Sequence, residues 1–290
     1  MNSASIEQKL PAAGTAGTLI FVVLVFVALY YLYQFLFSAN GMEGTTVLSG
    51  IKDARPDQAY ITLANALPAI YEGGEYTING WLYVNDYSIR RGLNKHVFSI
   101  GGSSFLTLAV FLGPYKNSLH VRVDTKDRDE KGNAKAANAN PSPADSADDL
   151  SATNLNTIFT GIQQESGLLS GNRPCDIQSI DLQKWVQVTV SLNNKTCDVY
   201  IDGKLARSCI LPSFYKVNTN NLTLRVAEYG GFGGFVSNVS AYNYALNPEQ
   251  IWRLYMGGPN VKYGLGDYLK SLFDPKALGS MDYPKQNITQ

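Results

Sequence analysis

The stretch from Lys184 to Cys209, KWVQVTVSLNNKTCDVYIDGKLARSC, constrains the fold most strongly because apolar and polar residues alternate along it. Its apolar residues at even positions from 186 to 192 fall on one face of an extended strand, and the polar residues between them fall on the other. Asp202 and Gly203 then supply the positive φ angles that a two-residue hairpin turn requires. The pattern therefore predicts antiparallel strands joined by a tight turn.

Short runs of the same kind, separated by turn residues, follow one another between Thr45 and Tyr244, where helical periodicity is nearly absent. This organisation predicts an all-β fold, a sandwich of antiparallel strands. The predicted strands are YITL from Tyr60, EYTINGWLYV from Glu75, HVFSI from His96, FLTLAVFL from Phe105, SLHVRV from Ser118, WVQVTVSL from Trp185, CDVYI from Cys197, KLARSCIL from Lys204, NLTLRVAE from Asn221 and GFVSNVSAYN from Gly234.

An uncharged segment precedes the strands, since no charged residue occurs between Leu10 and Met42. Its inner part, residues 16–37, is long enough at about 1.5 Å per residue to cross roughly 30 Å of hydrocarbon. The segment is therefore predicted to be a transmembrane helix, with tyrosines near its end that suit a membrane interface. The alternatives are a cleaved signal peptide, whose apolar run is usually shorter, and a buried core helix.

The predicted organisation is a polar N-terminal segment at 1–15, the transmembrane helix at 16–37, the sandwich at 38–257 and a C-terminal tail at 258–290. The charges on either side of the helix leave its orientation open. The chain has 24 basic and 24 acidic residues and no basic stripe, which argues against a nucleic-acid partner.

Two segments within this organisation have their own signals. Residues 126–156 are rich in Asp, Asn, Ala, Ser and Pro and have almost nothing to bury, so a surface insert is predicted, either a loop or an arm ordered against a neighbour. Near the end, Asn247, Pro248 and Gln250 have the spacing of a capped helix start, and Gly257 suits the helix end.

Three segments, EYTINGWLYVN, KWVQVTVSLNNKTCDVYIDGKL and GGFVSNVSAYNYALNPEQIWRLY, together resemble the laminin-G-like branch of the concanavalin A-like lectin/glucanase superfamily. The resemblance covers roughly residues 45–257 and implies a jelly-roll sandwich. Residues 175–209 look most like domains of this type in large icosahedral DNA viruses that enclose a membrane. That narrower resemblance implies a structural protein of a virion or a membrane.

Glycoside hydrolases occur on this sandwich, but the clustered acidic pattern of a laminarinase-like member is absent. Asp198 and Asp202 share a strand face, but Asp198 is expected to face solvent and Asp202 to be the turn residue. Asp127 and Asp129 have a suitable spacing but lie in the polar insert, where no rigid scaffold is expected. No catalytic residues are therefore predicted.

Metal ligands are also sparse. His96 and His120 are the only histidines and are expected to be ordinary strand residues rather than zinc ligands. Many laminin-G-like domains bind calcium, and Asp86 and Asp202 are possible donors, but no dense acidic loop supports a site. No metal and no cofactor are predicted.

The three cysteines cannot all pair within one chain. If Asp202 and Gly203 form a two-residue turn, Cys197 opposes Ser208 and Cys209 opposes Thr196, so the two cysteines point to opposite faces. The predicted disulfide is then Cys175 to Cys209, with Cys197 a buried free thiol. A bulge in the hairpin would overturn this interpretation, and three reduced thiols are the alternative.

Trp81 and Trp185 are expected to pack in the sandwich rather than to stack on a sugar, a role that would need an open concave face. The predicted function is that of a membrane-anchored, single-pass, non-enzymatic structural or interaction protein, a minor capsid protein that links the inner membrane of a virion to its capsid shell. Its partners would be membrane lipid, other proteins of the assembly and, in an alternative, carbohydrate. That alternative is a lectin of a cell or virion surface, and a second one is a β-glucanase.

Overall fold

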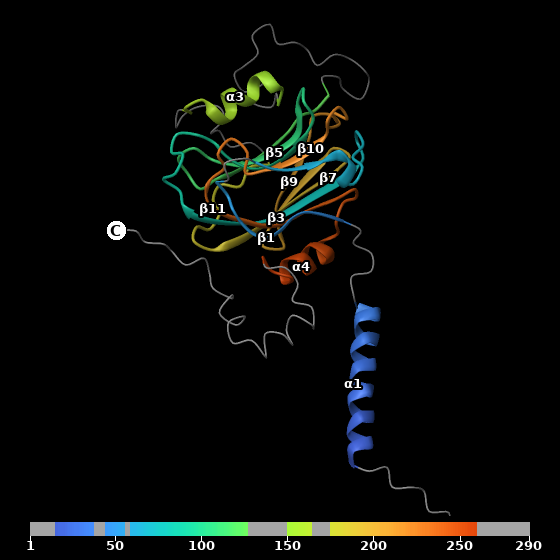
Figure 1. Ribbon diagram of the computed structural model, residues 1–290. Helices are drawn as coiled ribbons and strands as arrows, with labels where there is room; N and C mark the ends of the chain where they lie inside the picture. The colour runs from blue at the N-terminus through green and yellow to red at the C-terminus, as the bar shows by residue number, and fades with distance from the viewer. Residues whose placement is uncertain (1–14, 38–43, 56–58, 127–149, 164–174, 260–290) are drawn as a thin grey trace, which may run out of the picture. The chain divides into compact units, whose positions relative to one another are not determined.

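The computed structural model describes residues 15–37, 44–55, 59–126, 150–163 and 175–259 of the 290-residue chain (Figure 1). The chain divides into two compact units, Met1–Glu43 and Gly44–Gln290.

In the first unit the structure describes helix α1, at Thr15–Phe37, which carries no charged residue. The side chains that the structure describes between Ile20 and Leu32 include large apolar residues that are 40–68% exposed. Among the described residues of the chain, no helix combines the length and the apolarity needed to cross a membrane.

The second unit is an antiparallel sandwich of two sheets, as predicted (Figure 1). The six-stranded sheet has the order β1-β11-β3-β7-β8-β9, and the five-stranded sheet has the order β2-β10-β4-β5-β6. The strands are β1 Thr45–Asp53, β2 Tyr60–Leu63, β3 Glu75–Asp86, β4 Lys95–Gly101, β5 Leu106–Leu112, β6 Leu119–Val123, β7 Trp185–Asn193, β8 Thr196–Ile201, β9 Lys204–Ile210, β10 Thr223–Val226 and β11 Gly233–Tyr242.

One hydrophobic core fills the space between the sheets. The apolar residues at 186, 188, 190 and 192 all lie in it, as the alternation along β7 predicts, and each is at most 1% exposed. Leu108, Val110 and Leu112 of β5 contribute from the opposite sheet. Because burial of apolar area is the main stabilising force, this two-sided layer sets the stability of the domain.

Strand β1 is the one strand that the sequence pattern does not predict. It pairs with β11, but its register shifts between Thr46 and Leu48 and again between Leu48 and Ile51. Gly50 has a φ of 70° inside the strand. These irregularities break the two-residue period on which strand prediction depends.

Helix α3, at Ala152–Thr160, corrects the prediction that helices are nearly absent from this region. It covers the outer face of the five-stranded sheet, where Leu155, Ile158 and Phe159 pack with Leu106 and Phe111 of β5 (Figure 1). The end of the segment predicted as a polar insert is therefore folded, because these apolar residues have a helical spacing and a surface to cover.

Helix α4, at Pro248–Met256, covers the outer face of the six-stranded sheet. Asn247 and Gln250 form the predicted capping box, and Gly257 is the C-cap. The helix packs on the β8–β9 turn so closely that a Cβ on Gly203 would lie 2.8 Å from the Trp252 ring. Gly203 therefore meets two requirements: its φ of 74° is favourable for glycine, and its lack of a Cβ leaves room for the Trp252 ring.

The segment of Cys175, Asp176 and Ile177, called here the edge segment, joins the two sheets at one side of the sandwich. Strand β9 is the last strand of the six-stranded sheet, and β6 is the last strand of the five-stranded sheet. Ile177 pairs with Leu119 at the start of β6 through two backbone hydrogen bonds of 2.9 Å. Cys175 is bonded to Cys209 of β9. The edge segment thus fastens one edge strand of each sheet to the other.

Candidate functional site

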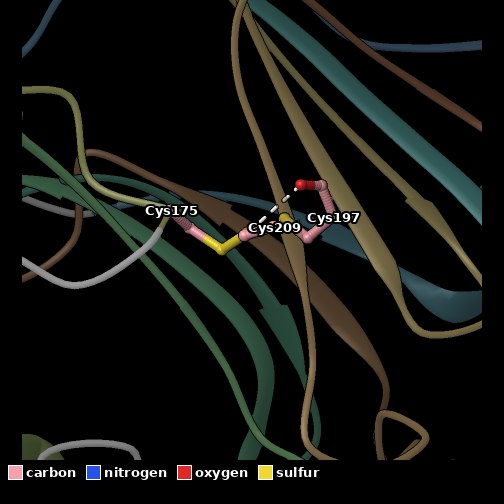
Figure 2. A group of neighbouring side chains, drawn as sticks. All are labelled: Cys175, Cys197 and Cys209. Atoms are coloured by element: carbon pink, nitrogen blue, oxygen red, sulfur yellow. Dashed lines mark hydrogen bonds between the residues drawn. A yellow bond between two sulfur atoms is a disulfide. The ribbon is translucent and has the colours of Figure 1, made fainter.

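The predicted site residues Cys175 and Cys209 lie together, joined as a disulfide with their Cα atoms 5.6 Å apart (Figure 2). Cys197 lies beside them on β8 as a buried free thiol. Cys209 Sγ also lies 3.2 Å from the carbonyl oxygen of Cys197, the contact that Figure 2 marks with a dashed line.

The register from which the pairing was inferred is wrong. Beside the turn, Ile201 faces Lys204, as a two-residue turn requires, but the register shifts between Val199 and Tyr200. Beyond the shift Cys197 faces Cys209 directly, so both side chains point into the same core. The extra residue in β9 is a bulge, the feature that a count from the turn cannot detect.

Among the described residues, one group could hold a metal ion by its geometry. It consists of the three cysteines, whose sulfur atoms lie within 4.8 Å of one another. In this state the disulfide occupies two of the sulfur atoms. Burial and, to a lesser extent, the charge of Asp198 raise the pKa of the Cys197 thiol to about 12. Because metal ligation requires thiolates, the oxidised cluster does not fit a metal ion.

Of the two acidic pairs, the structure describes Asp198 and Asp202, and it does not place them together as a glycosidase pair. Asp198 lies on β8 facing Ser208 of β9, whereas Asp202 lies beyond the end of β8. Asp202 sits in the turn at a φ of 50°, and its carboxylate accepts from the backbone N–H of Gln187 at 2.9 Å. Asp127 and Asp129 lie outside the described residues.

Asp86 and Asp202, the possible calcium donors, both accept hydrogen bonds from nearby protein groups. Asp86 accepts from the backbone N–H and the hydroxyl of Ser88 at 2.8 and 2.7 Å. Asp202 is held by Gln187 and lies 3.5 Å from Lys184 Nζ. Each carboxylate therefore acts as a turn acceptor.

A polar triplet that the sequence does not predict lies at the edge segment: Ser118, His120 and Asp176. Ser118 Oγ lies 2.9 Å from His120 Nε2, and His120 Nδ1 lies 2.8 Å from Asp176 Oδ2. Ser118 is 9% exposed, Asp176 3% and His120 1%. The sequence SLH places the first two on one face of a strand, but nothing in it indicates that a residue beside Cys175 would join them.

Asp176 is the centre of this network. Besides His120, its carboxylate accepts from both terminal nitrogens of Arg122 and from the backbone N–H of Val121. Burial alone raises the pKa of Asp176, but the hydrogen bonds from His120 and Arg122 outweigh it and lower the pKa to about 2. Asp176 is therefore an ionised carboxylate with a full set of donors, as a buried charge requires.

His96 and His120 both face Phe111 of β5, on the outer face of the five-stranded sheet. The hydrogen bonds of His96 form a separate network. His96 Nε2 is 2.9 Å from Ser99 Oγ, and its Nδ1 accepts from the backbone N–H of Glu228 at 3.0 Å. Burial, together with the charges of Arg225 and Arg90, lowers the pKa of His96 to about 3. His96 is therefore neutral in the folded protein at neutral pH.

An aromatic row, defined by Phe235, Tyr83 and Trp185, crosses three neighbouring strands on the outer face of the six-stranded sheet. Tyr83 faces Phe235 on one side and Trp185 on the other. The ring centroids are 6.2 and 5.5 Å apart, and all three side chains are partly exposed. Trp81, in contrast, is 4% exposed and stacks on Tyr255 of α4, as expected for a packing residue. The prediction of pure packing thus holds for Trp81, whereas Trp185 also reaches the surface.

Comparison with known proteins gives one family match. Residues 171–252 match the family model Laminin_G_3, described as the concanavalin A-like lectin/glucanases superfamily. No curated protein matches the chain.

Similar solved structures include binding domains of botulinum neurotoxins. The serotype D ligand-binding domain in complex with N-acetylneuraminic acid is 12% identical with a TM-score of 0.43, and the match covers 75% of this chain and 47% of that one. The serotype G binding domain is 14% identical with a TM-score of 0.40, over 75% and 47% of the two chains. The chain spans less than half of the length of these structures. The family match and the two-sheet topology support a laminin-G-like, concanavalin A-like domain.

The disulfide yields a first prediction. Closing a loop with a sequence separation of 34 residues is expected to stabilise the domain, by roughly 3–4 kcal/mol in the chain-entropy account. Cys175→Ser and Cys209→Ser should lower the melting temperature by similar amounts, and the double variant should lose little more because both remove the same crosslink.

Cys197→Ser serves as the control for that series, because it removes a thiol from the same core without opening the loop. Non-reducing peptide mapping should find Cys175 linked to Cys209. Three alkylatable thiols in the native protein, or a Cys197–Cys209 link, would contradict the pairing.

His96 yields a second prediction, on pH. Below about pH 6.5 the unfolded chain protonates this histidine while the folded chain keeps it neutral down to about pH 3. The unfolded state then binds the extra proton, so stability falls as the pH falls, with a slope that approaches about 1.4 kcal/mol per pH unit.

Denaturant unfolding between pH 6.5 and 5 measures this slope before most carboxylates titrate. His96→Gln keeps a donor toward Ser99 but cannot ionise, so its stability should vary less with pH over this range. Equal slopes for the variant and the wild-type protein would show that His96 does not contribute.

Proposed function

We propose that the protein is a membrane-anchored binding module, in which α1 lies in a bilayer and the sandwich engages partners outside it. The observation that carries this proposal is the surface of α1. Large apolar side chains between Ile20 and Leu32 are 40–68% exposed on it, and no charge interrupts Thr15–Phe37. Exposed apolar area of this kind is unfavourable in water and favourable in lipid.

The length of the uncharged sequence supports the same proposal. No helix among the described residues meets the length and apolarity needed for a membrane span, so this support comes from the uncharged sequence as a whole: residues 16–37 would extend over about 33 Å as a helix, against a hydrocarbon thickness of roughly 30 Å. Within a helix every backbone donor except those at the first turn is paired, which a lipid-embedded segment needs. The compact unit Gly44–Gln290 then forms the displayed domain.

The proposed place of the protein is the interface between the inner membrane of a virion and its capsid shell. The support for this is the resemblance of residues 175–209 to domains of membrane-containing DNA viruses, together with the proposed anchor. In this role the sandwich binds other proteins of the assembly.

Extraction tests the anchor. The full chain, expressed in cells, should stay with the membrane fraction in high salt and in alkaline carbonate, because burial of apolar side chains does not depend on charge. A variant with Leu24→Lys and Val27→Lys should be released, since each charge near the bilayer centre costs about 2.5–3.5 kcal/mol. Release of the intact wild-type protein by carbonate would contradict the anchor.

Carbohydrate binding is a second candidate function, and the aromatic row favours it. Three partly exposed rings lie side by side on β11, β3 and β7, and Lys184, which precedes Trp185 in the sequence, pairs with Asp181 and Asp202. The apolar face of a sugar ring stacks on aromatic rings, while charged and polar neighbours bind its hydroxyl groups. We infer that a glycan would bind at this row.

A glycan array probed with the protein in detergent tests this candidate. A bound glycan should be displaced by the same free sugar, and Trp185→Ala should weaken binding roughly tenfold, the equivalent of about 1.4 kcal/mol. Trp252→Ala is the matched control, because Trp252 is 42% exposed on α4 and lies outside the row. Absence of displaceable binding, or equal losses in both variants, would contradict the lectin function.

A further inference from the structure

The polar triplet has the connectivity of an acyl-transfer site. A serine hydroxyl contacts Nε2 of a histidine at 2.9 Å, and Nδ1 of the same ring contacts a carboxylate at 2.8 Å. Nucleophile, base and orienting group are recognised by this geometry rather than by their order in the sequence or by the fold.

The hydrogen bonds also determine which ring nitrogen of His120 carries the hydrogen when the ring holds only one. Asp176 is ionised, since its donors lower its pKa to about 2, and an ionised carboxylate only accepts. Nδ1 must therefore carry the hydrogen that is donated to Asp176. Nε2 is then left with a lone pair that accepts from the hydroxyl of Ser118, which is the state that general-base catalysis needs.

The second histidine–serine pair of the same sheet has the reverse arrangement. Nδ1 of His96 accepts from the backbone N–H of Glu228, so its neutral ring carries the hydrogen on Nε2 and donates it to Ser99. His96 is therefore unable to remove a proton from Ser99. The orientation at His120 is thus specific to the polar triplet.

Neighbouring groups hold the base and the nucleophile in place. Phe111 stacks on the His120 ring at 5.3 Å between centroids and 26° between planes. A Cβ on Gly113 would lie 2.5 Å from Ser118 Oγ and 3.1 Å from His120 Nε2, so only glycine leaves room for the pair to meet. Ser118 is the most exposed residue of the polar triplet, at 9%. It lies immediately before β6 and two residues after the exposed Lys116.

We propose that Ser118, His120 and Asp176 form a hydrolytic site for small carboxylic esters. The Ser118 oxygen bonds to the ester carbonyl carbon while its proton passes to His120 Nε2. The bond between that carbon and the alcohol oxygen then breaks, and the alcohol leaves with the proton from His120. Water repeats the sequence against the acyl group, with His120 as base, and releases the acid with Ser118 restored. Asp176 is a positioning residue that keeps the hydrogen on Nδ1. The limited exposure of Ser118 restricts the substrate to small acyl groups.

This activity goes beyond the proposed binding function and departs from the expectation of a non-enzymatic protein. It lies on the outer face of the five-stranded sheet, whereas the aromatic row lies on the outer face of the other sheet. A failure of either proposal therefore leaves the other unaffected.

The test uses the full chain in detergent with a small alkyl fluorophosphonate, in which the serine oxygen displaces fluoride from phosphorus. Peptide mapping should find the phosphonyl group on Ser118, and hydrolysis of p-nitrophenyl acetate should be lost when that residue is modified. Ser118→Ala should abolish both. Ser99→Ala, which removes the hydroxyl of the other pair, should leave both unchanged.

His120→Asn separates catalysis from packing, because the asparagine amide can still donate to Asp176 but offers no base. Its rate of Ser118 modification should fall roughly 100-fold or more, at a melting temperature that shows the protein to be folded. An unmodified Ser118 in the folded wild-type protein, or equal modification rates in wild type and His120→Asn, would overturn the proposal.

Discussion

The attachment of the edge segment to both sheets is the interaction on which the arrangement of this domain depends. Edge strands expose unpaired backbone groups, and two stacked sheets have no covalent reason to stay aligned at their edges. Ile177 pairs with β6, Cys175 is bonded to β9, and Asp176 between them neutralises the buried Arg122. Backbone pairing, a disulfide and an ion pair thus hold three successive residues. Together they fix the position of Asp176 and therefore of the polar triplet.

Local features of the chain allowed much of the fold to be predicted. Alternation along β7 depends only on neighbouring residues, and the Asp202–Gly203 turn and the Asn247 cap are equally local. The bulge between Val199 and Tyr200 is not encoded by any such pattern, so the cysteine register was wrong. Helix α3 is not predicted from the sequence because its few apolar residues follow a long polar stretch and are too few to establish a helical periodicity by themselves.

The candidate sites were less predictable because they are assembled over long distances in the sequence. The polar triplet joins residues of β6 to Asp176, and the aromatic row combines single rings from three strands. No sequence motif indicates either group of residues, because their proximity depends on the order of the strands in the sheets. The polar triplet and the aromatic row lie on opposite outer faces of the sandwich, so the proposed hydrolysis and the proposed glycan binding would use different surfaces.

The closure of the sandwich edge is tested most directly by hydrogen exchange in the native protein, comparing wild type with Cys175→Ser. The amide of Leu119 donates to Ile177 and that of Val121 to Asp176, so both report on the edge segment. If the disulfide holds this segment in place, both amides should exchange faster in the variant, while amides shared by β3 and β7 keep their protection. Unchanged exchange at Leu119 and Val121 would contradict the account.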